Sequence, residues 1–261
     1  IVLKPCRGRK YYELGNIFLA QQKYKTANAL YKKEVCTRPN HPQTLNNLGV
    51  VLNTLGKQNK SVLYFARAIV LEPAYAQAYN NVGNAFKTLG SFLQASNNYL
   101  KAIKIEPDYT QAFNNLGDNL KIIGLSHDAA VYLYRSIYLD PGYAEAYNNL
   151  ANVMLELGQY SLTSTFYDKA TTLKPHYAAA YSNKICVLNY YSSNTNENLN
   201  EAVKFGAILS KQRAKFFKTH RNSTNSKIRV GFVSADLRSH PVGYFLESVL
   251  AKIDQDKFEL F

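Results

Sequence analysis

Residues 76–109 read AQAYNNVGNAFKTLGSFLQASNNYLKAIKIEPDY, and this stretch decides the fold of most of the chain. Apolar residues recur at helical spacing in both halves, as Tyr79 and Val82 do in the first. Gly90, between the halves, suits the left-handed position that follows a helix. Pro107 cannot continue the second helix. The stretch therefore predicts two amphipathic helices joined by a tight turn.

The same pattern returns every 34 residues along the chain. Prolines at this spacing mark the end of each copy: Pro5, Pro39, Pro73, Pro107, Pro141 and Pro175. The period resembles that of the tetratricopeptide repeat (TPR), a helix–turn–helix unit that stacks into a superhelix. Gly83 lies in the first helix, where a Cβ would hold the two helices apart. We expect five complete copies, at residues 8–41, 42–75, 76–109, 110–143 and 144–177, after the tail of another copy at residues 1–7.

The next copy departs from the pattern, because Lys184 and Ile185 replace an apolar and a small residue. The repeat array is therefore predicted to span residues 8–191, with a partial sixth copy at its end. Residues 192–226 are interpreted as a linker that contains one helix, from about residue 197 to residue 217.

From Lys227 onward the sequence has the pattern of an α/β domain. Ile228–Ser234 is β-branched and apolar, a helix pattern begins at Pro241, and Phe258–Phe261 opens a second strand. We expect residues 227–261 to be the truncated first βαβ unit of a Rossmann-like domain. Because residues 1–5 align with the end of a repeat, the chain is expected to be a fragment.

The net charge of +13 is unevenly distributed. Residues 1–38 carry nine Lys/Arg against two Asp/Glu, residues 202–235 carry eight against none, and residues 39–201 carry eleven of each. A nucleic-acid groove needs positive charge repeated along one face, so the neutral central repeats argue against nucleic acid as a partner. No run of about 18 apolar residues is present, so no membrane span or membrane partner is expected.

Three cysteines, Cys6, Cys36 and Cys186, form no CxxC pair and no metal-binding spacing with the five histidines. We therefore expect no metal site, and buried free thiols as in a reducing compartment. The N-terminus also lacks the pattern of a signal peptide. Together these features indicate a cytoplasmic protein, which in a eukaryote would also enter the nucleus.

Five asparagines share one position of the repeat: Asn47, Asn81, Asn115, Asn149 and Asn183. The first helix of a TPR lines the concave surface, so these amides should form a row along the groove. An Asn amide both donates and accepts, and so can bind the main chain of an extended peptide whatever its side chains. The alternative is that asparagine is only tolerated on a polar helix face, and the neighbouring Asn46, Asn80, Asn114 and Asn148 favour that view. A clamp for C-terminal carboxylates is disfavoured, because only Lys87 and Lys121 lie one helical turn away.

One loop has the features of a catalytic site. Residues 236–244 lie at the C-terminal end of the first predicted strand and the N-terminal end of the predicted helix, where α/β folds place ligands. A histidine side chain ordinarily titrates near neutrality, so His240 in this loop could exchange a proton. A single histidine before a proline can equally be a capping or packing residue.

Asn-rich repeats, a linker helix, IRVGFVSAD at residues 228–236 and HPVGYFLE at residues 240–247 together resemble the protein O-GlcNAc transferases, closest to their bacterial and Spindly-like members. The resemblance implies a glycosyltransferase-B region of two Rossmann-like lobes, of which only the start is present. It implies sugar transfer from a nucleotide sugar, typically the co-substrate UDP-GlcNAc, to Ser/Thr of proteins bound by the TPR groove. It also matches His240 to the family's active-site histidine and puts the nucleotide-binding residues beyond Phe261.

Two other functions stay open at this stage. Spindly-like relatives use GDP-fucose, so an O-fucosyltransferase is one alternative. The other is a non-catalytic TPR scaffold for protein–protein interaction, whose C-terminal βαβ unit belongs to some other α/β domain.

Overall fold

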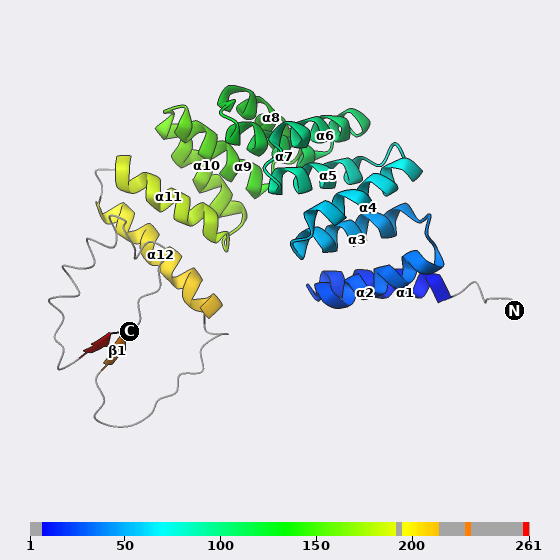
Figure 1. Cartoon of the computed structure of the whole chain (residues 1–261). Coiled ribbons are helices and arrows are strands. Elements are labelled where there is room, and N and C mark those ends of the chain that lie inside the picture. Colours follow the sequence, from blue (N-terminus) through cyan, green and yellow to red (C-terminus); the bar gives the residue numbers. More distant parts are fainter. Residues whose placement is uncertain (1–6, 192–194, 214–227, 231–257, 261) are drawn as a thin grey trace, which may run out of the picture. The chain divides into compact units, whose positions relative to one another are not determined.

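The computed structural model describes residues 7–191, 195–213, 228–230 and 258–260. The chain divides into two compact units, Ile1–Lys211 and Gln212–Phe261, and each is described by itself. The described residues contain twelve helices (Figure 1). They are α1 (Arg7–Ala20), α2 (Tyr24–Thr37), α3 (Pro42–Thr54), α4 (Gln58–Leu71), α5 (Ala76–Thr88), α6 (Phe92–Ile105), α7 (Thr110–Ile122), α8 (Ser126–Leu139), α9 (Ala144–Glu156), α10 (Tyr160–Leu173), α11 (Ala178–Tyr191) and α12 (Thr195–Arg213).

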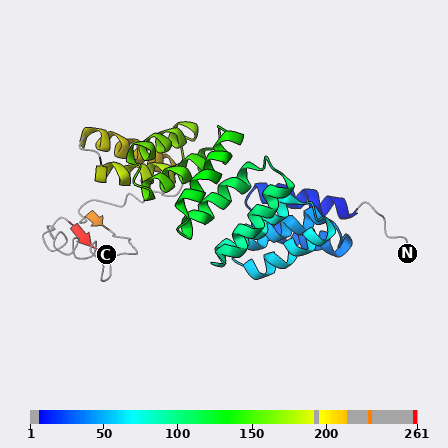
Figure 2. The same cartoon turned by 90° about the horizontal axis from the view of Figure 1, so that it is seen from above.

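Consecutive helices form hairpins, from α1 with α2 to α9 with α10, and each hairpin packs against the next (Figures 1 and 2). The five hairpins extend over Arg7–Thr37, Pro42–Leu71, Ala76–Ile105, Thr110–Leu139 and Ala144–Leu173. Among the described residues, successive first helices contact one another from α1 and α3 to α7 and α9, whereas successive second helices approach less closely. A stack whose first helices are more closely spaced curves toward them. The first helices therefore line the concave side of the repeat array, which is an all-α TPR superhelix.

A residue in the left-handed conformation follows each of the first five first helices. Four of them are glycines, with φ between 72° and 81°: Gly56, Gly90, Gly124 and Gly158. Glycine has no Cβ and adopts this conformation at little cost, as predicted for Gly90. In the first repeat the position is occupied by Gln22, with φ 58°. A residue with a Cβ costs about 1–2 kcal/mol in this conformation, so the first repeat has the least favourable turn.

The prolines end the second helices as the sequence predicts. Helices α2, α4, α6, α8 and α10 each end two residues before a proline, and the residue between is extended, with φ from −129° to −137°. The ring of a proline clashes with a preceding residue in helical conformation, which explains this geometry. The 34-residue period is thus set by one glycine turn and one proline stop in each copy.

Glycine in the first helix lets the two helices of a hairpin approach closely. A Cβ on Gly83 would lie 2.5 Å from Cε1 of Tyr99, which is fully buried. Gly15 and Gly49 face an aromatic ring in the same way. The prediction for Gly83 is therefore confirmed.

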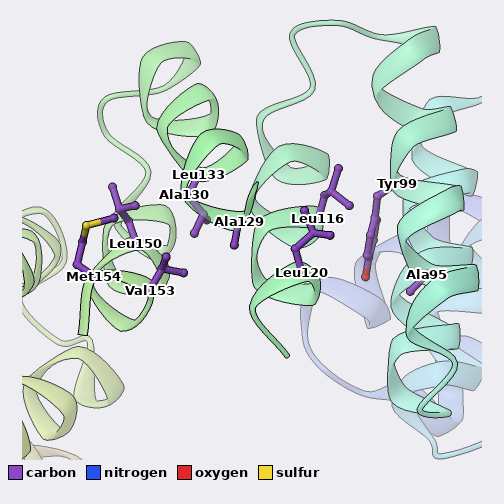
Figure 3. Packing of buried hydrophobic residues seen from close by; sticks show 10 residues of the cluster. All are labelled: Ala95, Tyr99, Leu116, Leu120, Ala129, Ala130, Leu133, Leu150, Val153 and Met154. Carbon is purple, nitrogen blue, oxygen red and sulfur yellow. The ribbon is translucent and has the colours of Figure 1, made fainter. Parts of the chain in front are cut away.

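Neighbouring repeats share their apolar core. One cluster of ten buried side chains extends over helices α6 to α9, and Figure 3 shows them between the ribbons. Its members are Ala95, Tyr99, Leu116, Leu120, Ala129, Ala130, Leu133, Leu150, Val153 and Met154. Because the cluster crosses two repeat boundaries, each repeat is stabilised by its neighbours.

The sixth copy also contains a pair of helices, α11 and α12, and ion pairs contribute to their packing. Lys184 Nζ on α11 lies 2.9 Å from Glu201 Oε2 on α12 and 2.7 Å from Asp168 Oδ1 on α10. The rings of Tyr181 and Phe205 stack with their centroids 6.4 Å apart. Helix α12, predicted from about residue 197 as part of a linker, therefore packs on α11.

The second unit contributes two described strands, β1 (Ile228–Val230) and β2 (Phe258–Leu260). They pair in parallel, with Ile228 opposite Phe258. The predicted helix between them and the loop that carries His240 lie outside the described residues. Two strands of three residues are not a Rossmann-like domain, so this strand pair is all that the structure describes of the predicted βαβ unit.

One prediction about the cysteines is wrong. Cys36 and Cys186 are free but exposed, not buried, and Cys6 lies outside the described residues. Cys186 takes the position that Asn152 has one repeat earlier, on the groove side of the first helix. Within the described residues no helix is long and apolar enough to cross a membrane.

Candidate functional site

The asparagine row (Asn47, Asn81, Asn115, Asn149 and Asn183) lies on the first helices α3, α5, α7, α9 and α11. Each side chain is half-buried, and each Nδ2 donates a hydrogen bond to an asparagine of the preceding repeat. The bonds are Asn47 to Asn16, Asn81 to Asn46, Asn115 to Asn80 and Asn149 to Asn114 at 2.9 Å, and Asn183 to Asn148 at 3.2 Å. The row therefore connects all six repeats.

Four of the acceptors are the neighbouring asparagines that the sequence left unexplained. Asn46 is fully buried, and Asn80, Asn114 and Asn148 are each 5% exposed. A buried amide oxygen without a hydrogen bond would destabilise the protein, and the cross-repeat bond supplies a donor to each of these oxygens. They are thus not residues tolerated on a polar face. The signal in the sequence is the Asn-Asn pair in successive copies, which places a donor and its acceptor 35 residues apart.

The row keeps hydrogen-bonding capacity after these contacts. An Asn amide has two N–H groups and an oxygen with two lone pairs, and the cross-repeat bond uses one N–H. The oxygen of Asn149 accepts only a long bond of 3.3 Å, from Asn148. Asn81, Asn115 and Asn149 thus each have a donor and an acceptor left for a ligand, whereas Asn183 Nδ2 also bonds to Asn152 Oδ1 over 3.4 Å and the Asn47 amide also contacts Tyr31. Such pairs, repeated in three successive TPRs, match the N–H and C=O groups of an extended chain.

The floor of the groove is set by a second polar contact within each hairpin. Where the second helix supplies a buried tyrosine, its hydroxyl donates to an asparagine one turn beyond the row. These pairs are Tyr31 with Asn16 at 2.7 Å, Tyr99 with Asn84 at 2.8 Å and Tyr167 with Asn152 at 2.6 Å. In the repeat that has Phe65 instead, the partner position is the apolar Val50. The polar residues of the groove are therefore held in fixed positions.

The repeat with Leu133 in place of the tyrosine carries Asp118 at the partner position. Asp118 forms an ion pair with Lys87 of the preceding repeat, and Lys121 Nζ lies 3.8 Å from its other oxygen. Both lysines considered for a carboxylate clamp thus already face a carboxylate. The structure therefore gives a further reason against such a clamp.

A row of tyrosines directly precedes the first helices: Tyr75, Tyr109, Tyr143 and Tyr177. Burial raises the pKa of Tyr75, Tyr109 and Tyr143 to about 12, and nearby acidic groups act in the same direction, whereas a hydrogen bond with Asn80 lowers the pKa of Tyr109. Burial also raises the pKa of Tyr177. All four stay protonated near neutral pH, so they add neutral hydroxyls beside the groove.

No group of three or more His, Cys, Asp or Glu side chains in the described part of the chain could hold a metal ion. His240 and its loop lie outside that part. The residues that the structure brings together are thus hydrogen-bonding amides and hydroxyls, which are suited to binding.

Three family models match the chain. One described as "TPR repeat" matches residues 83–120, and two described as "Tetratricopeptide repeat" match residues 42–75 and 132–162. No curated protein sequence matches it.

Several solved structures have a similar fold. MamA is 23% identical, with a TM-score of 0.53, over 66% of this chain and 93% of MamA. PilF of Pseudomonas aeruginosa is 18% identical, with a TM-score of 0.65, over 79% of this chain and 92% of PilF. YrrB, described as a TPR protein with an unusual peptide-binding site, is 19% identical, with a TM-score of 0.51, over 72% of this chain and 98% of YrrB. At these identities the likeness concerns the fold alone.

Proposed function

We propose that this tetratricopeptide repeat protein captures extended segments of other proteins along the asparagine row. The observation that carries the proposal is the half-used amide in three successive repeats, at Asn81, Asn115 and Asn149. Their remaining donors and acceptors can pair with main-chain groups, which every peptide has. The array is then a protein-binding scaffold that accepts many sequences.

Two further observations support this function. The cross-repeat bonds fix each amide before a ligand arrives, so little conformational entropy is lost on binding. The YrrB fold, described as having a peptide-binding site, is built from the same kind of repeat. The ionic contacts of Asp118 lie one turn from the row and would favour particular side chains near that point.

The test is binding of an unbiased peptide library by the purified chain. The variant carries Asn81→Ala, Asn115→Ala and Asn149→Ala together, and its helicity is measured by circular dichroism. The control carries Asn59→Ala, Asn97→Ala and Asn98→Ala, which alter second helices. The proposal expects weaker capture in the row variant only. Equal capture by both folded variants would contradict it.

As a second candidate we propose that the array serves a glycosyltransferase of the O-GlcNAc transferase type. The observation in its favour is the resemblance of residues 228–247, together with the parallel pairing of β1 with β2. The captured segments would then be acceptors for a sugar from UDP-GlcNAc, or from GDP-fucose in the Spindly-like case, with His240 beside the sugar.

Transfer of labelled sugar by the longest natural form of the protein tests this candidate. A His240→Ala variant should lose most of the transfer while still capturing peptides. Transfer that is unchanged in His240→Ala would remove this histidine from the mechanism. Absence of transfer from both nucleotide sugars would leave the scaffold as the function.

A further inference from the structure

A groove on the first two repeats has a different character from the asparagine row. It has a volume of about 430 Å³ and is lined by α2, the end of α3 and α4. We propose that this groove, called here the basic groove, binds an acidic protein segment that carries an apolar side chain between its carboxylates. Its lining residues are Lys32, Leu52, Lys57, Lys60, Leu63, Tyr64 and Arg67.

No carboxylate in the described part of the chain pairs with the cations of the basic groove. Among the described residues no ion pair involves Lys32, Lys57 or Lys60, and Arg67 donates only to the carbonyl of Pro39, over 3.3 Å. From residue 23 to residue 71 the one acidic residue is Glu34, and it is buried and paired with Arg38. The four cations of the basic groove are therefore available to pair with an anionic ligand.

The floor of the basic groove is apolar and partly open. Leu63 is 66% exposed on α4, beside the half-buried ring of Tyr64. Exposed apolar surface within a ring of charges is typical of a site that buries an apolar group of a partner. A partner that supplies both carboxylates and an apolar side chain would satisfy the whole lining.

The equivalent groove two repeats later shows that this charge is not a general property of the fold. It has a volume of about 280 Å³ and keeps the apolar floor, with Leu120 and Tyr132 at the positions of Leu52 and Tyr64. Its other lining residues differ in charge: Leu100 replaces Lys32, and Asp128 replaces Lys60. Of these two grooves, only the one on the first two repeats is therefore basic.

A peptide fits this groove better than a nucleic acid does. A polynucleotide binds along a continuous track of positive charge. Residues 39–201 carry eleven basic and eleven acidic residues, so no such track continues along the later repeats. An acidic segment of a few residues needs only the local charge. The proposal is independent of what the asparagine row binds, because the basic groove lies mainly on second helices.

The test measures the affinity of a fluorescent synthetic peptide, rich in glutamate around one phenylalanine, for the whole chain at physiological salt. The variant Lys32→Leu with Lys60→Asp installs the side chains of the later groove, which this fold already tolerates. The control Lys101→Asp with Lys104→Leu makes the same change of net charge on exposed positions of α6. Circular dichroism confirms that both variants are folded.

The proposal expects the groove variant to bind the peptide about tenfold more weakly or worse, and the control to bind within about twofold of the unaltered chain, because exposed charges act weakly at a distance. A peptide with serine in place of phenylalanine should also bind more weakly. Equal losses in both variants, or equal binding of the serine peptide, would overturn the proposal. So would a single-stranded oligonucleotide that binds more tightly than the peptide and loses affinity in the groove variant, or no binding of the peptide at all.

Discussion

Removing one buried acceptor of the asparagine row should uncouple two repeats. Asn114 is 5% exposed and accepts from Asn149 Nδ2 over 2.9 Å, and its own amide makes a 3.4 Å contact with Asn115. A hydrogen bond stabilises a protein by about 0.5–1.5 kcal/mol net, and a buried unsatisfied amide costs about 1–3 kcal/mol. We therefore expect Asn114→Ala to lower the free energy of unfolding by about 1–3 kcal/mol.

A double-mutant cycle isolates the bond between the two repeats. Asn149→Ala leaves the buried oxygen of Asn114 without its donor, so it should also lower the free energy of unfolding by about 1–3 kcal/mol. The double variant should lose about 0.5–1.5 kcal/mol less than the sum of the single losses.

Urea unfolding followed by circular dichroism measures these differences. In a repeat array a weaker interface also broadens the transition, since each repeat depends on its neighbours. The control is Asn97→Ala, at an exposed position of α6, which should change stability by less than about 0.5 kcal/mol. A coupling energy below about 0.3 kcal/mol would refute the structural part of the account.

Three further predictions follow from single features of the structure. Gln22→Gly should raise the free energy of unfolding by about 1 kcal/mol, because it relieves the left-handed turn; urea unfolding should show this gain, and no gain would contradict it. Burial opposes ionisation of Glu201, but hydrogen bonds from Lys204 and Lys184 hold the pKa of this carboxyl below its ordinary value. Its stabilisation is therefore present above the unfolded pKa and lost as pH falls through the folded pKa, so unfolding curves of Glu201→Gln and the unaltered chain should differ at neutral pH and converge in acid. Asp118→Asn should release Lys87 and so strengthen binding of a peptide C-terminal carboxylate in a fluorescence titration, and unchanged binding would show that the ion pair does not block it.

The repeat boundaries could be predicted from the sequence because each depends on a local backbone rule. Gly90 supplies the left-handed turn, and Pro107 ends the second helix whatever surrounds it. The close approach at Gly83 also follows from the absence of a Cβ. These features recur every 34 residues, so a boundary that is ambiguous in one copy can be placed by comparison with the other copies.

The site could be predicted only in part, because it depends on contacts between repeats. The spacing of Asn81 and Asn115 indicated a row, but not that their amides bond to the preceding copy. The ion pair of Asp118 with Lys87 crosses a repeat boundary in the same way. Lys184 appeared to end the pattern, whereas its charge is used to hold α12. Cys36 is exposed because it lies on the outer face of its helix. The tendency of free thiols to be buried does not indicate which face of a helix a cysteine occupies.

The central claim is that the asparagine row recognises the main chain of an extended segment. A peptide selected from the library is made in three forms: unaltered, with its side-chain order scrambled, and with alternate backbone amides N-methylated. Isothermal titration to the whole chain compares the three affinities. The account predicts that the scrambled peptide binds within about tenfold of the original, whereas N-methylation, which removes main-chain donors at about 1 kcal/mol or more each, abolishes measurable binding. Retained affinity after N-methylation, with loss on scrambling, would show that side chains carry recognition and would contradict the account.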